Sequence, residues 1–237
     1  MMTRMYLALT LAIAFVATAG IVEGQDDLRE RFARATPSVG ALYAHTEEGN
    51  LKFLCSITAT DRHEDAIVML TAWHCVGSGT AYVVSFNGRQ FYDARLWKGP
   101  HYHIDPKGSP RIFGEPETDL ALFLVDGLPS NTPLIPVGVR LIAQGDRVIM
   151  VGFPLGIAKI GYEGLVAGHF NRPGADYDGY LLLQIFGTSG SSGSAVIGPD
   201  ARIAGVLVAG RTGSIGLPVI FAVPIRYQRY LLEVKPK

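Results

Sequence analysis

The sequence contains few charged residues and no excess of either sign. Lysine and arginine number 21, aspartate and glutamate number 21, and the formal net charge is zero. No run of lysine or arginine is present. Such a chain lacks the basic patch that binds nucleic acid or an anionic membrane surface. We therefore expect neither as a partner.

Cysteine is also scarce, since Cys55 and Cys75 are the only two. Two thiols without further cysteine and histidine ligands make a poor zinc site. In an oxidising compartment, closing a loop of about twenty residues is worth about 3 kcal/mol in the chain-entropy model. We expect a disulfide between them. His101 and His103 lie in a polar loop sequence, where histidines are usually solvated, and we expect no metal and no cofactor.

The N-terminus has the pattern of a secretory signal peptide. Arg4 precedes an apolar run over residues 5–16, and Ala17-Thr18-Ala19 follows as a small-x-small sequence. The run is short for a membrane span, and the three features together are typical of a cleaved signal. We predict cleavage after Ala19 and a secreted or periplasmic protein without membrane contact. An uncleaved membrane anchor is the alternative.

Glycine (28) and proline (14) are frequent, which favours a turn-rich β protein. Six strand patterns follow Pro37, with Asn87-Gly88 as a hairpin signal, and six more follow the linker-like segment Gly127–Pro133. We expect an all-β fold of two six-stranded antiparallel barrels. The expected strands are 39–43, 51–58, 66–70, 80–86, 90–97, 120–125, 147–152, 161–169, 179–185, 194–197, 203–209 and 219–223, with a polar turn at 60–65 and an irregular loop at 98–118.

These patterns divide the chain into five parts. Residues 25–36 have apolar positions at helical spacing, so they form a short helix or a solvated arm. Residues 225–234 also have helical periodicity. The expected parts are the signal peptide 1–19, an N-terminal arm 20–37, the first barrel 38–127, the second barrel 128–225, and a C-terminal helix and tail 226–237.

Glycines surround Ser192 in the sequence Gly190-Ser191-Ser192-Gly193. A serine hydroxyl is a useful nucleophile only if a base takes its proton and N–H groups hold the resulting oxyanion. Because Gly190 has no Cβ, it can adopt a positive φ and turn its N–H toward the same point as that of Ser192. Taken alone, this run also suits a flexible linker.

Two residues in the first half of the chain can supply the base that Ser192 requires and the carboxylate that orients this base. His74 follows an apolar strand beside Cys75, and Asp119 begins the apolar run of the next one. Each residue alone fits a structural role in the core or at a strand start. Together they fit a general base and the carboxylate that fixes its tautomer.

Four segments together resemble the chymotrypsin-like serine proteases. Thr71–Cys75 is similar to the T-A-x-H-C signature, and Cys55–Thr58 to the strand that supplies the partner of the histidine-loop disulfide. Thr118–Leu122 resembles the D-[IL]-A-[LV] strand, and Gly190–Ala195 the G-x-S-G-[GS]-[PA] turn. The chain order His, Asp, Ser is that of chymotrypsin.

Val151–Gly156 and Phe221–Ile225 look closest to bacterial trypsin-like proteases of the HtrA type. Since the chain ends about a dozen residues after the last expected strand, we expect no PDZ domain. Ile21–Gly24 resembles the N-terminus that activates trypsin-type enzymes by pairing with an aspartate before the nucleophile. Here that residue is Ser191, so we interpret the match as fortuitous and expect activation by signal removal alone.

The resemblance implies a serine endopeptidase that acts on proteins or peptides, and we expect a monomer. It assigns Ser192 as nucleophile, His74 as base, Asp119 as its orienting carboxylate, and the N–H groups of Gly190 and Ser192 as the oxyanion hole. A pocket near Phe186, Leu207–Gly210 and Val219–Phe221 would bind the residue N-terminal to the cleaved bond. The lining residues that we predict are Phe186, Val208, Gly210 and Phe221.

The residue at position 186 is Phe186 rather than an acid, and no histidine follows His169 in the sequence. We therefore expect this pocket to prefer a small or medium apolar residue. Two alternatives remain open. Gly187-Thr188-Ser189-Gly190 also satisfies G-x-S-G, with Ser189 as nucleophile. A chymotrypsin-fold binding protein without turnover is the other alternative.

Overall fold

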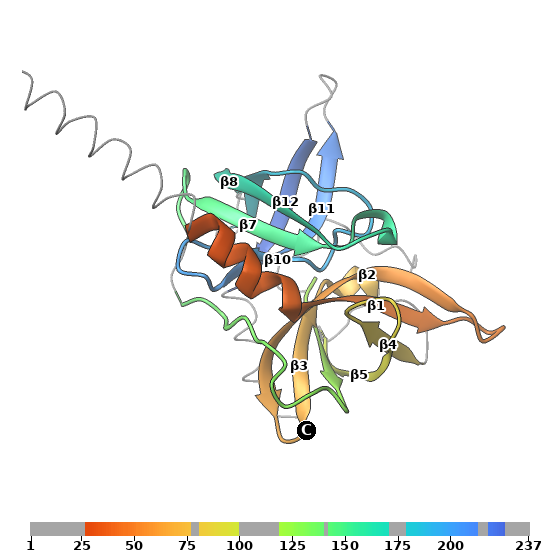
Figure 1. The fold of residues 1–237 in the computed structure, drawn as a ribbon. Coiled ribbons are helices and arrows are strands. Elements are labelled where there is room, and N and C mark those ends of the chain that lie inside the picture. The colour runs from red at the N-terminus through yellow and green to blue at the C-terminus, as the bar shows by residue number, and fades with distance from the viewer. Residues whose placement is uncertain are drawn as a thin grey trace, which may run out of the picture.

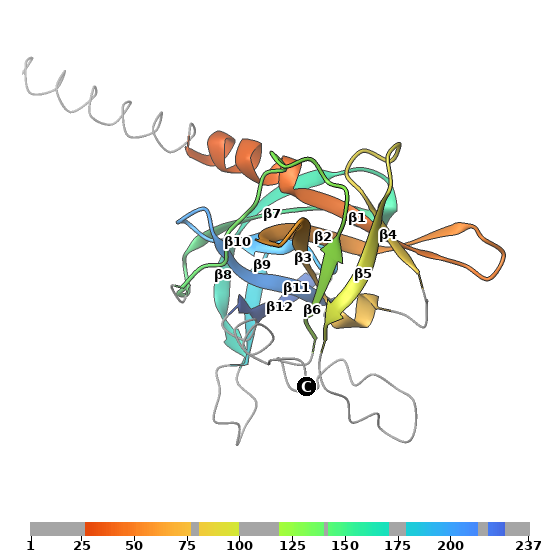
Figure 2. The same cartoon turned by 90° about the horizontal axis from the view of Figure 1, so that it is seen from below.

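The fold consists of two closed antiparallel β-barrels, one above the other in Figure 1 and seen from below in Figure 2. The computed structural model describes residues 27–76, 81–99, 119–139, 142–170, 179–212 and 218–225. Each barrel contains six strands, so the expected fold class is confirmed. No helix among these described residues is long and apolar enough to cross a membrane.

The first barrel has the closed strand order β1-β2-β3-β6-β5-β4. β6 is buried along its whole length, as its continuous apolar sequence requires. The strands are β1 (Val39–His45), β2 (Leu51–His63), β3 (Ala66–Thr71), β4 (Tyr82–Ser85), β5 (Tyr92–Lys98) and β6 (Ala121–Val125).

The second barrel repeats this topology, with the closed order β7-β8-β9-β12-β11-β10. Each position in this order corresponds to the first barrel with six added to the strand number. The strands are β7 (Arg147–Gly152), β8 (Ile160–Phe170), β9 (Tyr180–Gln184), β10 (Ala195–Ile197), β11 (Ile203–Thr212) and β12 (Pro218–Pro224). Short 3-10 turns are η1 (Thr36–Ser38), η2 (Trp73–Cys75) and η4 (Pro154–Gly156).

Residues 27–35 form a helix that joins the two barrels. It crosses the second barrel in Figure 1 before the chain enters β1 of the first. The buried Arg31 guanidinium donates to the carbonyl oxygens of Ile197 (3.1 Å) and Gly198 (2.8 Å) at the end of β10. Of the two forms expected for this segment, the structure therefore contains the helix, packed rather than solvated.

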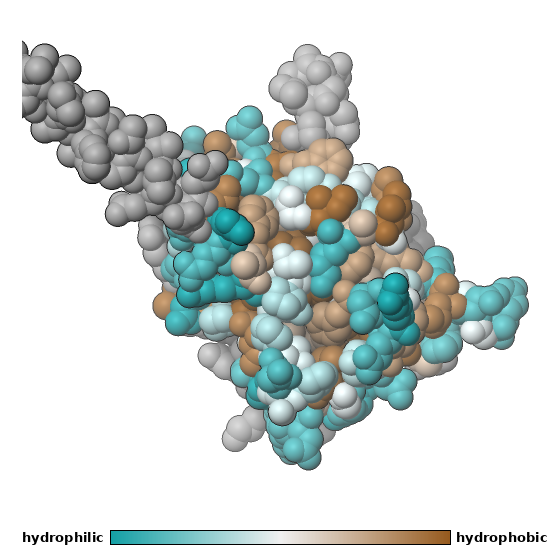
Figure 3. Space-filling model, viewed as in Figure 1, coloured by the Kyte–Doolittle hydropathy of each residue, from teal (hydrophilic) through white to brown (hydrophobic). Residues whose placement is uncertain are grey.

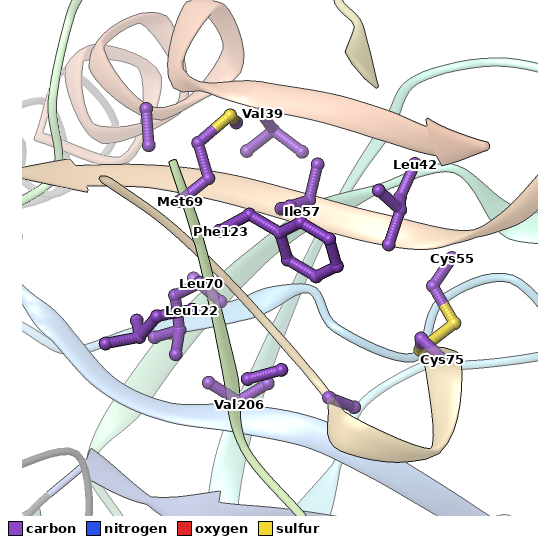
Figure 4. Close-up of a cluster of buried hydrophobic side chains, with 14 of the residues drawn as sticks. Val39, Leu42, Cys55, Ile57, Met69, Leu70, Cys75, Leu122, Phe123 and Val206 are labelled. Carbon is purple, nitrogen blue, oxygen red and sulfur yellow. A yellow bond between two sulfur atoms is a disulfide. The ribbon is translucent and has the colours of Figure 1, made fainter. Parts of the chain in front are cut away.

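One apolar core continues from the first barrel into the second. Phe123, Ile57 and Leu42 are fully buried inside the first barrel and lie together in Figure 4. Val206 of β11 belongs to the same cluster. The barrels are therefore packed against each other through side chains rather than only tethered by the linker. A separate cluster, which includes Val148, fills the second barrel.

The expected turn at residues 60–65 is shorter in the structure. β2 continues to His63 and pairs that residue with Ala66, so only Glu64 and Asp65 turn the chain. The polar residues 61–63 are exposed, because this end of the hairpin extends beyond the barrel. The expected signal peptide and C-terminal helix, and residues 100–118 of the expected loop, lie outside the described residues.

Candidate active site

Strand pairing brings His74 and Asp119 to the same edge of the first barrel. β3 and β6 are antiparallel neighbours, and Thr71 pairs with Ala121. His74 lies three residues beyond Thr71 in η2, and Asp119 lies two residues before Ala121. In an antiparallel pair, the end of one strand faces the start of the other. The register alone therefore makes these two side chains neighbours.

Asp119 holds His74 through both its backbone and its ring. Oδ1 of Asp119 accepts from the His74 backbone N–H at 2.9 Å. His74 Nδ1 lies 3.1 Å from Oδ1 and 3.0 Å from Oδ2. An ionised carboxylate only accepts, so the proton belongs on Nδ1 and Nε2 carries the free lone pair. The Asp119 side chain is 18% exposed and that of His74 is 32% exposed.

The disulfide expected between Cys55 and Cys75 is confirmed, with the Cα atoms 5.9 Å apart. It joins the last residue of η2 to β2, as Figure 4 shows, and so fixes the turn that carries His74. A ring nitrogen of His74 and the two sulfur atoms lie within 4.8 Å of one another. Sulfur atoms bonded to each other are not thiolates, so this cluster does not fit a metal site.

Two glycines with left-handed backbone shape the turn around Ser192. Gly190 has φ +86° and Gly193 has φ +81°. The Leu155 N–H donates to the carbonyl of Ser189 at 2.7 Å, so the next N–H, that of Gly190, points the opposite way. Within the described part of the chain, neither the Gly190 N–H nor the Ser192 N–H has a hydrogen-bond partner. Both donors are available to an oxyanion.

Ser56, which the sequence did not single out, anchors this turn. Its backbone N–H donates to the Ser192 carbonyl at 2.9 Å. Its hydroxyl donates to the Gly190 carbonyl at 2.9 Å and accepts from the Phe153 N–H at 2.8 Å. Its own carbonyl accepts from the hydroxyl of Thr71 at 2.8 Å. Ser56 is the neighbour of Cys55, so one strand holds both the histidine loop and the serine turn.

This arrangement distinguishes Ser192 from Ser189. Ser192 is half-buried and hydrogen-bonded to β2 of the first barrel, next to the disulfide that leads to His74. Ser189 is exposed, and its carbonyl is bonded to Leu155 within the second barrel. Among the described residues, no hydrogen bond joins the Ser192 hydroxyl to His74. Catalytic hydrogen bonds of this kind often tighten only when substrate is bound.

Ser191 occupies the position where trypsin-type enzymes have an aspartate. It is fully buried, and its hydroxyl accepts from the Thr188 N–H at 3.3 Å. Its own N–H donates to the Thr188 carbonyl at 2.9 Å. A neutral side chain with a local partner requires no buried ammonium group as counter-charge. Ile21–Gly24 lies outside the described residues.

The four predicted pocket residues have different surroundings. Phe186 is 53% exposed and packs against Tyr162, with ring centroids 4.9 Å apart. Gly210 is exposed on β11. Val208 and Phe221 are buried in the core cluster shared by the two barrels. Phe221 and Ile220 are consecutive residues of β12, so their side chains point to opposite faces of the strand.

Ile220, within the expected range but not named there, closes the space between two glycines. A Cβ added at Gly187 would lie 3.0 Å from Ile220 Cδ1, and one added at Gly210 would also lie 3.0 Å from it. Ile220 is 1% exposed. The isoleucine side chain therefore fills the space that these glycines leave open.

Among the described residues, Lys159 is the one group with a strongly shifted pKa, and it lies between Thr36, before the first barrel, and Phe153 of the second. Burial lowers the pKa of Lys159 from 10.5 to about 8. Its Nζ donates to the Thr36 carbonyl at 2.9 Å and lies 5.6 Å from the Phe153 ring centroid. No carboxylate pairs with it in the described residues. Burial without a counter-charge favours the neutral amine.

Two barrels with a histidine–carboxylate pair on one and a glycine-flanked serine on the other define the chymotrypsin-like class. A family model described as a trypsin-like peptidase domain matches residues 57–206, which are 150 of the 237 residues. The chain belongs to this family of trypsin-like peptidases.

Solved structures of HtrA-type proteases share the fold. The crystal structure of the serine endoprotease from Yersinia pestis matches with a TM-score of 0.65 at 19% identity, covering 86% of this chain and 65% of that one. The HtrA-type protease AlgW with a decapeptide matches with a TM-score of 0.64 at 19% identity, covering 85% of this chain and 65% of that one. The chain thus spans about two thirds of the length of these proteins.

Proposed function

We propose that this protein is an exported serine endopeptidase in which Ser192, His74 and Asp119 form the catalytic triad. The observation that carries the proposal is the pair of contacts between His74 Nδ1 and the Asp119 carboxylate. They leave Nε2 as the basic nitrogen. The turn that carries Ser192 is hydrogen-bonded to Ser56 of β2, and the turn that carries His74 is joined to the neighbouring residue of β2 by the disulfide. Membership in the trypsin-like peptidase family supports the same chemistry.

In the proposed reaction, Ser192 Oγ attacks the scissile carbonyl and His74 Nε2 accepts the hydroxyl proton. The N–H groups of Gly190 and Ser192 hold the negative oxygen of the tetrahedral intermediate. When the C–N bond breaks, His74 returns the proton to the leaving amine, and an acyl-enzyme remains. Water then attacks this ester with His74 as base, which releases the acid and restores Ser192. Asp119 stabilises the imidazolium at both stages.

The pocket residues support a preference for a small or medium apolar residue before the cleaved bond. Ile220 occupies the space between Gly187 and Gly210, which shortens any cavity there. Neither Phe186 nor Ile220 offers a charge to a basic or acidic substrate side chain. A peptide-library profile should therefore be dominated by residues such as alanine and valine. A profile dominated by arginine, lysine or glutamate would reject this preference.

Export is supported by the disulfide between Cys55 and Cys75, since such bonds persist in oxidising compartments. It is also supported by the sequence pattern of residues 1–19. N-terminal sequencing of the protein recovered outside the cytoplasm should begin at residue 20. A chain that still begins with Met1 would contradict signal cleavage.

Labelling by a fluorophosphonate probe tests the catalytic proposal directly, because the probe phosphonylates only an activated serine. The wild type and Ser189→Ala should be labelled, whereas Ser192→Ala should not. Both variants replace a serine of the same turn, so Ser189→Ala controls for damage to its backbone. Labelling that survives in Ser192→Ala but not in Ser189→Ala would move the nucleophile to Ser189. A folded wild type without any labelling would favour the binding-protein alternative.

A further inference from the structure

Three side chains that can bind a metal ion lie together at the disulfide. Hydrophilic and hydrophobic residues are interspersed on the face drawn in Figure 3, whereas this group lies largely beneath the surface. It consists of Cys55, His74 and Cys75, and each cysteine is 4% exposed. One ligand atom from each residue lies within 4.8 Å of the other two. Among the described residues, this is the one such group of three.

The disulfide excludes a metal ion only after it has formed. Cysteines are thiols when a chain is synthesised, and an oxidising compartment joins them later. The chain therefore passes through a dithiol form, in which Cys55 and Cys75 are separate sulfur ligands. The thiolate is the form that binds metals, and a coordinated thiol is deprotonated.

Hydrogen bonds that involve no sulfur atom keep the three ligands near one another in the dithiol form. The His74 backbone N–H donates to Asp119 Oδ1 at 2.9 Å, which holds the turn η2 to the end of the first barrel. The Thr71 hydroxyl donates to the Ser56 carbonyl at 2.8 Å, which holds β2 beside the start of this turn. Before oxidation, the sulfur atoms are therefore free to move while the elements that carry them stay adjacent.

The spacing of the ligand atoms suits a small tetrahedral ion. With Zn–S bonds of about 2.3 Å and a Zn–N bond of about 2.1 Å, a tetrahedral ion places its sulfur ligands about 3.8 Å apart and each about 3.6 Å from the nitrogen. The Cα atoms of Cys55 and Cys75 are 5.9 Å apart, which leaves room for the sulfur atoms to separate by side-chain rotation. The ring nitrogen of His74 starts within 4.8 Å of both. Small side-chain movements therefore complete the site.

His74 already has the surroundings of a metal-binding histidine. Such histidines almost always donate the N–H of their other ring nitrogen to a carboxylate, a carbonyl or water. Nδ1 of His74 makes this contact with Asp119, 3.0 Å from Oδ2, so the lone pair of Nε2 is available to a metal. The His74 side chain is 32% exposed, which gives an ion a way in from solvent.

We propose that the dithiol form of this chain binds one Zn²⁺ ion through the sulfur atoms of Cys55 and Cys75 and through His74 Nε2. Thiolate and imidazole ligands together select zinc over magnesium or calcium. Two thiolates balance the charge of the ion, and water completes the tetrahedron. The ion occupies the lone pair that would accept the Ser192 proton, so the zinc-bound chain is inactive. This last step rests on the proposed peptidase function.

Oxidation releases the ion and the base together. An organic disulfide takes two electrons from the two thiolates and two protons from water, and becomes two thiols. A bond forms between the sulfur atoms of Cys55 and Cys75, both zinc–sulfur bonds break, and Zn²⁺ leaves. Nε2 of His74 then regains its lone pair. The disulfide therefore switches the peptidase on in addition to fixing the histidine turn.

A titration with Co²⁺ tests the site without using activity. Co²⁺ replaces Zn²⁺ in thiolate sites, and its bonds to sulfur absorb in the near ultraviolet. The wild type is reduced with a phosphine and desalted without oxygen. It should then bind one Co²⁺ per chain with this absorption, and one equivalent of Zn²⁺ should remove the signal. The oxidised wild type should show no such absorption.

Variants of the reduced protein test each ligand. His74→Ala should weaken Zn²⁺ binding by at least about 100-fold, and Asp119→Asn, which keeps all three ligands, by about tenfold. His45→Ala is the matched control, because His45 is an exposed histidine at the end of β1, and it should bind as the wild type does. Replacing both Cys55 and Cys75 with alanine should abolish binding. Zn²⁺ should raise the melting temperature of the reduced wild type but not that of this double variant.

Fluorophosphonate labelling measures the effect of the ion on Ser192. The reduced wild type should lose its labelling as one equivalent of Zn²⁺ is added. Oxidised glutathione should restore the labelling and release the ion to a chromogenic chelator. The double alanine variant should keep its labelling at the same Zn²⁺ concentration.

The outcomes separate this metal site from the proposed function. A reduced wild type that binds no Co²⁺ would overturn the site, and so would equally tight binding by His74→Ala. Labelling that persists with one equivalent of Zn²⁺ bound would also overturn it, because His74 Nε2 would then not be a ligand. Metal binding as expected in a chain that is never labelled in its oxidised form would overturn the peptidase and leave the metal site intact.

Discussion

The backbone N–H of Ser56 donates a 2.9 Å hydrogen bond to the carbonyl oxygen of Ser192. This contact joins β2 of the first barrel to the serine turn of the second. Because the preceding residue of β2, Cys55, is bonded to Cys75, the same strand also holds the histidine loop. The relative position of the proposed base and nucleophile therefore depends on one short stretch of one strand.

Ser56→Ala should loosen this connection. It removes the hydroxyl that bridges the Gly190 carbonyl and the Phe153 N–H, both of which are in the second barrel. Leaving two buried backbone groups unpaired should lower the free energy of unfolding by about 1–3 kcal/mol. We also expect kcat to fall by about tenfold, because the Gly190 carbonyl lies in the turn that carries both proposed oxyanion-hole N–H groups. Denaturant unfolding and ester hydrolysis measure the two effects.

Thr58→Val is the matched control on the same strand. Its hydroxyl is buried and has no hydrogen-bond partner among the residues that the structure describes, and valine has nearly the same shape. Its removal should leave stability equal or slightly higher and should not change kcat. Equal losses in the two variants would show that any polar change in β2 is damaging, and not the Ser56 bridge in particular.

Asp119→Asn should reduce kcat/KM by about 10³–10⁴ with little change in folding. Asparagine keeps the shape of the side chain, but it does not stabilise an imidazolium and allows the wrong tautomer of His74. Steady-state hydrolysis of a peptide ester, together with the melting temperature, measures both parts. Near-normal kcat/KM in a folded Asp119→Asn protein would remove Asp119 from the triad.

Replacing both Cys55 and Cys75 with alanine should lower the free energy of unfolding by about 3 kcal/mol, the value for a closed loop of this size. Activity should fall further than stability alone explains, because the turn that carries His74 loses its link to β2. The wild type in reductant should behave like the double variant, and reductant should not affect the double variant. A wild type that keeps full activity after complete reduction would contradict this role.

Lys159 predicts an unusual dependence of stability on alkaline pH. With a pKa of about 8 in the folded state and 10.5 as its ordinary value, the lysine binds a proton more weakly when folded. Between these values the unfolded chain holds the proton that the folded chain has released, so stability rises with pH. The slope has an upper limit of about 1.4 kcal/mol per pH unit, because a single proton is released, and it should be smaller because the group is only half-buried.

Lys159→Met should abolish this rise. The comparison belongs between pH 8 and 9.5, because burial raises the pKa of Tyr43 and Tyr82 above 10 and these groups act in the opposite direction at higher pH. Urea unfolding of both proteins across this window provides the measurement. Parallel curves for the two proteins would mean that Lys159 titrates normally.

Ile220→Ala should enlarge the pocket for the residue before the cleaved bond. We expect the ratio of kcat/KM for leucine or phenylalanine over alanine to rise by about tenfold or more. Leu183→Ala is the control, since Leu183 pairs with Ile220 across β9 and β12 and is equally buried. Both variants should lose about 2–5 kcal/mol of stability, but only Ile220→Ala should change the preference. The same shift in both would exclude a specific role for Ile220.

Much of this architecture is readable from the sequence because strands follow local patterns. β6 is a continuous apolar run that follows an acidic residue, so the residues of the strand itself, Ala121–Val125, are enough to locate it. The sequence predicts β7 at its observed bounds, Arg147–Gly152, since Gly152 and Pro154 mark its end. The predicted end of β2 is too early, because residues 61–63 are polar although they remain paired with β3.

The features that the sequence did not reveal depend on contacts between distant residues. The Ser56 hydroxyl bonds to groups 97 and 134 residues away, and nothing near Ser56 indicates them. The left-handed conformation of Leu155 is equally hidden, since glycine is the residue expected there. Arg31 lies in a segment that the sequence predicts as a short helix or a solvated arm, and its partners are the carbonyl oxygens of Ile197 and Gly198, far along the chain. Such partners become visible only when both barrels are assembled.

The division into two barrels has a consequence for when the folding protein becomes active. Each barrel closes on itself, yet one holds the imidazole and the carboxylate while the other holds the alcohol. Under the proposed mechanism neither half hydrolyses a peptide bond alone, and a nascent chain stays inactive until its second half has folded onto the first. Hydrolysis is then a direct readout of completed assembly.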